Sequence, residues 1–92
     1  MRIYIDPGAE YHNGYLFVCG TISKHRGQIR REDINIGGVP VYLNIFPNRR
    51  GTHMYCCTTE IRGTCTLNAL GSIVKSIRSY MKTYNNGGSY KS

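Results

Sequence analysis

Lysine and arginine side chains gather in three parts of this chain, and their chemistry is that of anion binding. The positions are Lys24, Arg26, Arg30, Arg31, Arg49, Arg50, Lys75, Arg78 and Lys82. Ammonium and guanidinium groups donate hydrogen bonds to phosphate and carboxylate oxygens, and a guanidinium group can do so through two parallel bonds. We therefore predict that these residues form the contact surface for an anionic partner.

The group Lys75, Arg78 and Lys82 is notable because no Asp or Glu follows Glu60. Hydroxyl side chains are interspersed with these bases at Ser72, Ser76, Ser79 and Thr83. A solvated helix usually mixes acids with bases, since opposite charges four residues apart attract each other. Bases and small hydroxyls together suit phosphate oxygens, which accept hydrogen bonds from both. The alternative is an ordinary exposed helix face.

The other basic residues lie in segments that we expect to be exposed. Arg49 and Arg50 belong to a turn over residues 47–51, where arginine can contact phosphate or carboxylate once the turn is ordered. Charges beside strands also protect sheet edges from aggregation. This alternative fits Arg30 and Arg31 better than the turn arginines.

The sequence offers little for catalysis. Its acids are Asp6, Glu10, Glu32, Asp33 and Glu60, and their spacing matches neither a metal nuclease nor a glycosidase pair. Cys65 is a possible nucleophile, because a thiol near a helix N-terminus has a lowered pKa, and His53 could be its base. Nothing in the sequence brings these two residues together. We predict that the protein is not an enzyme and has no small-molecule substrate.

Four cysteines lie in a chain of 92 residues, at Cys19, Cys56, Cys57 and Cys65. The N-terminal segment lacks the apolar region of a secretory signal, so we expect reduced thiols. No paired C-x-x-C spacing is present, and a zinc site would have to recruit His12 or His53. Packing in the core is therefore the expected role, with neither a metal nor another cofactor.

Length and charge limit the classes of protein further. The chain carries a net charge of +7, and 92 residues suffice for one hydrophobic core only. No stretch reaches the roughly 18 apolar residues of a membrane span. We expect a cytoplasmic protein without membrane contact, with one domain over residues 1–88 and a frayed tail over residues 89–92. Its basic surface favours nucleic acid or an acidic protein as partner.

Alternation of apolar and polar residues at 2–6 and 39–46, and a run of β-forming residues at 15–22, predict strands in the first two thirds of the chain. They cover residues 2–6, 15–22, 39–46 and about 53–62, with a weaker strand at 29–36. Asn13-Gly14 and Gly37-Gly38 are turn dipeptides between these segments. Pro40 lacks an N–H, so we expect it at the start of its strand or at a sheet edge.

The apolar period becomes helical from Thr66 onward. The stripe consists of Leu67, Leu70, Val74, Ile77, Met81 and Tyr84. Thr64 or Thr66 can cap this helix, residues 85–88 stop it, and close approach to a strand would explain Gly71 inside it. We predict an α+β fold in which a small antiparallel β-sheet meander of three to five strands is covered by one C-terminal α-helix.

Eight tyrosines and no tryptophan supply most of the aromatic surface. Tyr4, Tyr42 and Phe46 fall on outward strand positions, where tyrosine is favoured at interfaces and as a platform for base stacking. Residues 14–18 resemble in part the aromatic RNA-binding strand of RRM domains. The basic residue and the last aromatic of that motif are missing, and no helix fits between the first strands.

The whole chain resembles the small phage-encoded anti-CRISPR proteins in its length, its strand-rich residues 1–62 and its helix over residues 66–84. The resemblance implies stoichiometric inhibition in the host cytoplasm. The protein would dock on a type I CRISPR surveillance complex of Cas proteins and guide RNA and block hybridisation of target DNA. The basic charge departs from the acidic, DNA-mimicking members and suits contact with guide RNA or an acidic subunit.

Two other classes stay open. One is a small DNA- or RNA-binding regulator of the AP2 or integrase-arm type, in which a three-stranded sheet enters the major groove. Base readout needs arginines aimed outward from strands, whereas the arginines here cluster in turns. The other class is a structural or assembly protein of a phage, for which self-association would be the indication.

Overall fold

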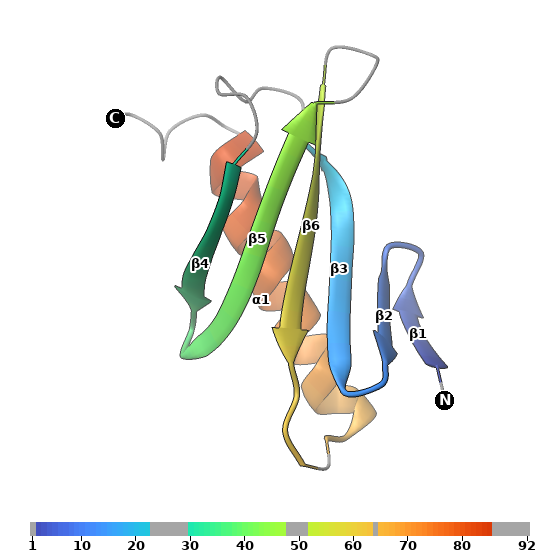
Figure 1. Cartoon of the computed structure of the whole chain (residues 1–92). Coiled ribbons are helices and arrows are strands. Elements are labelled where there is room, and N and C mark those ends of the chain that lie inside the picture. Colours follow the sequence, from blue (N-terminus) through green and yellow to red (C-terminus); the bar gives the residue numbers. More distant parts are fainter. Residues whose placement is uncertain (1, 23–29, 48–51, 64, 86–92) are drawn as a thin grey trace.

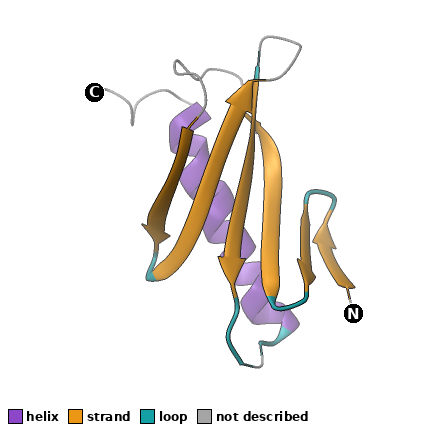
Figure 2. Cartoon of the chain, viewed as in Figure 1, coloured by secondary structure: helices purple, strands orange, loops and turns teal. Residues whose placement is uncertain are grey.

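The computed structural model describes residues 2–22, 30–47, 52–63 and 65–85, and the predicted tail over residues 89–92 lies outside these ranges. The elements are β1 (Arg2–Asp6), β2 (Ala9–His12), β3 (Tyr15–Ile22), β4 (Arg30–Ile36), β5 (Val39–Pro47), β6 (His53–Glu60) and α1 (Leu67–Asn85). In the described part of the chain, six strands form one antiparallel sheet and α1 lies across one of its faces (Figures 1 and 2). The α+β class and the covering helix are confirmed, with slightly more strands than the three to five expected.

The strand order differs from that of a single meander. It runs β1-β2-β3-β6-β5-β4, so two three-stranded meanders join through the pairing of β3 with β6. Charge explains why β6 is central and β4 is at the edge. β6 carries its one Asp, Glu, Lys or Arg residue at its end, Glu60, whereas β4 contains Arg30, Arg31, Glu32 and Asp33. A charged strand is tolerated best where one side stays open to water.

Two predicted turns are present and fix the register of their hairpins. Asn13 and Gly14 have φ angles of 52° and 82°, the left-handed values that a tight hairpin turn requires. Gly37 and Gly38 have φ angles of 60° and 88°, and the Gly38 N–H donates a 2.8 Å hydrogen bond to Asn35 Oδ1. These turns place β2 beside β3 and β4 beside β5.

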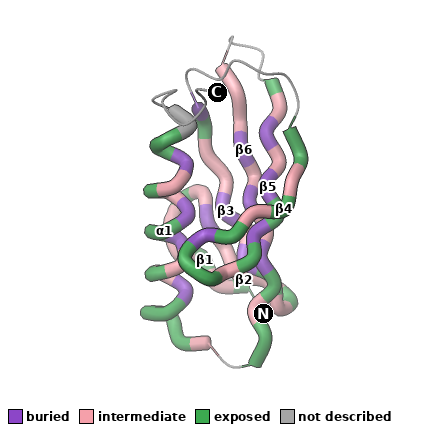
Figure 3. Tube along the Cα trace, turned by 90° about the vertical axis from the view of Figure 1, so that its left-hand side faces the viewer, coloured by how far each residue is buried: buried purple, intermediate pink, exposed green. Residues whose placement is uncertain are grey.

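The core lies between the sheet and α1. From the helix, Leu70, Val74, Ile77 and Met81 are buried, as their spacing predicted. The facing strands contribute Ala9, Leu16, Val18, Ile22, Ile36, Val41, Leu43, Ile45, Tyr55 and Cys57. Figure 3 shows these buried segments facing each other across the interface.

The helix begins one residue later than predicted, at Leu67. Thr66 Oγ1 accepts a 3.1 Å hydrogen bond from the Ala69 N–H, which identifies Thr66 as the cap. No helix in the described residues has the length and apolar character needed to cross a membrane.

Candidate functional site

No element in the described part of the chain covers the face of the sheet opposite α1 (Figure 1). Strand register places aromatic side chains on that face. We call this the open face, and its aromatic and large apolar side chains are Tyr4, Tyr15, Phe17, Tyr42, Phe46 and Met54. Tyr4, Tyr15 and Tyr42 are 68%, 43% and 42% exposed. The outward placement predicted for Tyr4 and Tyr42 agrees with the register.

Strand register aligns three of these rings in one row. Tyr4 pairs with Glu10, Glu10 with Phe17, Phe17 with Thr58, and Thr58 with Tyr42. Neighbouring strands lie about 4.8 Å apart, so Tyr4, Phe17 and Tyr42 stand at intervals of roughly 10 Å. The rigid sheet therefore presents a preformed aromatic row.

A shallow groove separates Tyr4 from Phe17 in this row. Its volume is about 380 Å³, and it is lined by Tyr4, Pro7, Gly8, Ala9, Glu10, Phe17 and Cys19. The open face is thus hollowed near its β1 edge, where a protruding partner side chain or a flat ring would be held between aromatic walls.

The Arg78 guanidinium forms hydrogen bonds to several elements of the sheet. It donates two parallel hydrogen bonds to the Asp6 carboxylate, from Nε to Oδ2 at 3.1 Å and from Nη2 to Oδ1 at 2.9 Å. Its Nη1 donates to the Cys19 carbonyl at 3.1 Å and to Tyr55 Oη at 2.8 Å. Asp6 Oδ1 also accepts the Gly8 N–H at 2.8 Å. Arg78 therefore fastens α1 to the β1–β2 hairpin, β3 and β6.

This network shifts the acidity of its members. The hydrogen bonds from Arg78 lower the pKa of Asp6 from its ordinary value of 3.8, while desolvation opposes them. The same bonds raise the pKa of Arg78. Burial raises the pKa of Tyr55, and the positive charge of Arg78 reduces this effect. At neutral pH Asp6 is therefore a carboxylate and Tyr55 a neutral hydroxyl, and both accept hydrogen bonds from the Arg78 guanidinium.

Acid should weaken the fold through Asp6. A lowered carboxyl pKa gives stability that is present above the unfolded value of 3.8 and is lost as pH falls through the folded pKa. We expect Asp6→Asn to be less stable than the wild type at neutral pH and to lose less stability below pH 3.8. Urea denaturation over a pH series measures this, with Asp33→Asn, an exposed carboxyl, as the control. Equal acid losses in wild type and Asp6→Asn would contradict the assignment.

Glycine makes room for the network at Gly8. A Cβ there would lie 2.6 Å from the Cys19 carbonyl oxygen and 2.9 Å from Arg78 Nη2. We expect Gly8→Ala to lower the free energy of unfolding by about 2 kcal/mol, since backbone must move.

Gly71 is the control for this prediction. Nothing lies within 4 Å of a Cβ there, so the predicted close approach of Gly71 to a strand is wrong. Gly71→Ala should stabilise the helix by roughly 0.5–1 kcal/mol. Thermal denaturation should give shifts of opposite sign.

The predicted helical base group is divided by this arrangement. Arg78 is turned inward and its side chain is 31% exposed. Lys75 and Lys82 are exposed, and neither forms an ion pair with any residue that the structure describes. They border a groove of about 440 Å³, lined by Ile5, Asp6, Gly71, Val74, Lys75, Arg78, Ser79 and Lys82. We call Lys75 and Lys82 the lysine pair.

The remaining predicted contact residues are distributed differently. Lys24, Arg26, Arg49 and Arg50 lie outside the described residues. Arg30 and Arg31 are exposed on the edge strand β4, and Arg30 Nε lies 3.4 Å from Glu32 Oε2. Their position at the edge agrees with the alternative of edge protection.

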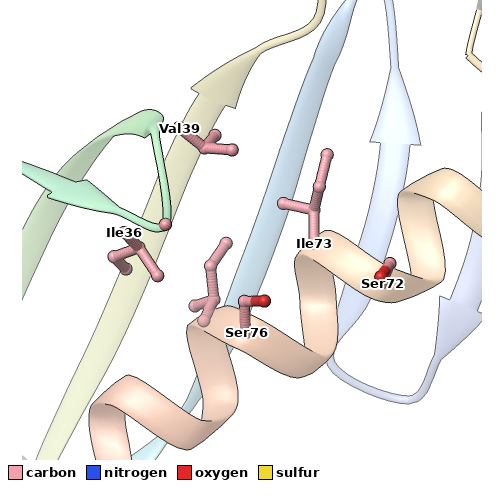
Figure 4. Close-up of a pocket in the computed structure, with 7 residues that line it drawn as sticks. Ile36, Val39, Ser72, Ile73 and Ser76 are labelled. Carbon is pink, nitrogen blue, oxygen red and sulfur yellow. The ribbon is translucent and has the colours of Figure 1, made fainter.

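The serines of α1 do not all accompany the lysines. Ser72 and Ser76 border a groove of about 200 Å³ on the other flank of the helix, beside the β4–β5 turn (Figure 4). Its other walls are Ile36, Gly37, Val39, Ile73 and Ile77. None of the basic residues that the structure describes lines this groove, whereas Ser79 lies with the lysine pair. The proposed mixture of bases and hydroxyls therefore reduces to Lys75, Ser79 and Lys82.

The residues considered for catalysis and metal binding are separated by the fold. His53 begins β6 and Cys65 follows the opposite end of that strand, so the length of β6 lies between them. Among the described residues, no three His, Cys, Asp or Glu side chains gather in a way that could hold a metal ion. Cys57 is buried in the core, as expected of a packed thiol, but the same expectation is wrong for Cys19 and Cys56, which are half-buried on the opposite face of the sheet.

The Arg78 network was missed by the sequence analysis because its members lie in four separate elements. Arg78 and Asp6 are 72 positions apart, and no motif connects them. One usable signal was present: an arginine at the border of the apolar stripe, on a helix without acids, needs its carboxylate from elsewhere in the fold.

Comparisons with family models, with curated proteins and with solved structures give no match for this chain. The geometry itself defines two candidate binding surfaces, the open face and the lysine pair.

Proposed function

We propose that this chain is a non-enzymatic inhibitor that binds a type I CRISPR-Cas ribonucleoprotein surveillance complex and blocks hybridisation of target DNA. The observation that carries the proposal is the open face, with its row of Tyr4, Phe17 and Tyr42 on a rigid sheet. Tyrosine supplies large amphipathic contact area at low entropic cost, and its ring stacks on nucleotide bases. A ribonucleoprotein offers both kinds of partner.

Charge supports an RNA-containing partner over a purely protein one. The chain carries +7, and the lysine pair has no described counter-ion. Both surfaces meet at β1, because Tyr4 belongs to the open face while Ile5 and Asp6 line the groove that the lysine pair borders. A partner that encloses the β1 edge would contact aromatic rings on one side and ammonium groups on the other. Guide RNA or an acidic Cas subunit fits that combination.

Reversal of the lysine pair tests the electrostatic half of this surface. We expect Lys75→Glu/Lys82→Glu to weaken binding to the purified complex by about 10-fold or more and to reduce its salt dependence. Arg78 is left unchanged, because Arg78→Glu would place a second carboxylate against Asp6. Biolayer interferometry at several salt concentrations gives the affinities. Arg62→Glu, an exposed charge on the segment after β6, is the control. Unchanged affinity in a folded double variant would remove the lysine pair from the interface.

A second candidate is an RNA-binding regulator, and the exposed tyrosines of the open face favour it, because such rings can also stack on free RNA. Affinity for free guide RNA separates the two functions. The inhibitor should bind the assembled complex much more tightly than free guide RNA. A regulator should bind free RNA alone, with an affinity that falls steeply with salt.

A further inference from the structure

Two thiols lie directly opposite each other near the centre of the open face. Cys19 of β3 pairs with Cys56 of β6, and their Sγ atoms are 3.0 Å apart. Both residues are half-buried and both thiols are free. They come from the two strands that join the two meanders.

The backbone around Cys19 shows what kind of pair this is. The Cys19 N–H donates to the Gly8 carbonyl at 2.8 Å, and the Cys19 carbonyl accepts from Arg78. Both backbone groups of Cys19 therefore point away from β6. In an antiparallel ladder this defines a non-hydrogen-bonded pair, in which the Cα atoms lie about 4.5 Å apart and the side chains approach closely. A Cα separation near 4.5 Å falls within the range that a disulfide spans.

The other cysteines lack this geometry. Cys57 points into the core and is 1% exposed. Cys65 lies ahead of α1, beyond the end of β6. Of the four thiols, the two on the open face are thus the pair in register.

We propose that Cys19 and Cys56 are an oxidative modification site, which forms an intramolecular disulfide on reaction with a low-molecular-weight disulfide such as oxidised glutathione. This goes beyond the proposed function and does not depend on it. One thiol loses its proton and attacks a glutathione sulfur, so that one glutathione leaves as thiolate and takes up a proton. The second cysteine thiolate then attacks the protein sulfur of the mixed disulfide and releases the second glutathione. Two protein thiols are oxidised while one disulfide is reduced.

The bond would connect the two meanders covalently through their central strands. It would close a loop between positions 37 apart in the sequence. Because this loop constrains the unfolded chain, we expect the melting temperature to rise by about 10 °C or more on oxidation.

Reactivity should be slow at neutral pH. Burial raises the pKa of Cys19 to about 12, and the neighbouring Cys56 thiol adds to the effect. Thiolate is the reacting species, so incubation should extend over hours.

The test incubates the full chain with oxidised glutathione, blocks the remaining thiols by alkylation and measures intact mass and melting temperature. The expected product has lost two hydrogen atoms, carries two alkyl groups and melts higher until it is reduced. Cys65→Ala and Cys57→Ala should still form the bond, whereas Cys19→Ala and Cys56→Ala should not. The Cys57→Ala variant shows that the bond is formed by Cys56 and not by the adjacent Cys57, a distinction that peptide mapping cannot make because both residues fall in one proteolytic peptide.

Three outcomes would overturn the proposal. The wild-type chain could keep four alkylatable thiols, it could stop at a mixed disulfide with glutathione, or Cys19→Ala could form an internal disulfide as readily as the wild type. None of these readouts involves a binding partner, so they are independent of the proposed function.

Discussion

Replacement Arg78→Ala will lower the free energy of unfolding by about 2–3 kcal/mol and the melting temperature by roughly 10–20 °C. The variant loses the paired bonds to Asp6 and those to the Cys19 carbonyl and Tyr55. The loss is large because the Tyr55 hydroxyl loses the donor Arg78, and the Asp6 carboxylate loses its paired cation and keeps only backbone donors such as the Gly8 N–H. Partial exposure of the Arg78 and Asp6 side chains, 31% and 33%, keeps the effect below that of a fully buried ion pair.

Controls separate this effect from a general change in helix charge. Lys75→Ala removes an exposed base one turn earlier on the same helix and should change stability by less than about 0.5 kcal/mol. Arg78→Lys keeps the charge without the planar fork and should fall between the two. Hydrogen exchange should show the β1–β2 hairpin losing protection first in Arg78→Ala. A melting temperature equal to that of Lys75→Ala would contradict the structural role of Arg78.

The proposed function predicts that Tyr42→Ala will weaken binding to the surveillance complex by about 10-fold or more, and that Tyr4→Ala/Tyr42→Ala will weaken it further. Tyr42 and Tyr4 occupy opposite ends of the aromatic row on the open face. Their removal deletes two exposed rings without touching the core, so thermal stability should change little. Affinity and melting temperature should therefore respond separately, in contrast to Arg78→Ala.

Leu67→Ala is the matched control for this prediction. Leu67 is 59% exposed, similar to Tyr4, but it lies at the start of α1 and away from the open face. Its replacement should leave the affinity unchanged. If Leu67→Ala and the tyrosine variants had equal effects, or if the double tyrosine variant bound like the wild type, the open face would not be the interface.

Local patterns predicted most elements of this fold. β-forming residues at 15–22 and alternation at 39–46 marked β3 and β5, and the spacing from Leu70 to Met81 identified the buried face of α1. These signals are local because each element exposes one face and buries the other. β2 was missed because four residues are too few for a clear period.

The strand order was beyond the reach of these patterns. Hairpin turns fix neighbours within each meander, but the pairing of β3 with β6 joins segments separated by two other strands. Charge in β4 was the available hint, since Arg30 to Asp33 suit an edge. Charge in β4 alone indicates an edge position for this strand, but it does not say which strands pair in the centre of the sheet.

The candidate site was predictable only in part, because local alternation indicates which way a side chain points but not which residues meet across the fold. Alternation placed Tyr4 and Tyr42 outward, and their exposure follows from the uncovered sheet face. Residue type alone could not separate Arg78 from Lys75 and Lys82, because the difference arises from Asp6 across the helix–sheet interface. The basic stripe that suggested one anion site contains a structural arginine between two exposed lysines.

The most direct test of the proposed function is a titration of target-DNA hybridisation. A purified type I surveillance complex with its guide RNA is incubated with increasing amounts of the chain, and labelled target DNA is then added. The proposed function predicts that hybridisation falls in proportion to the added chain and is abolished near a fixed stoichiometric ratio, while Tyr4→Ala/Tyr42→Ala requires a large excess. Full hybridisation in the presence of excess folded wild-type chain would contradict it.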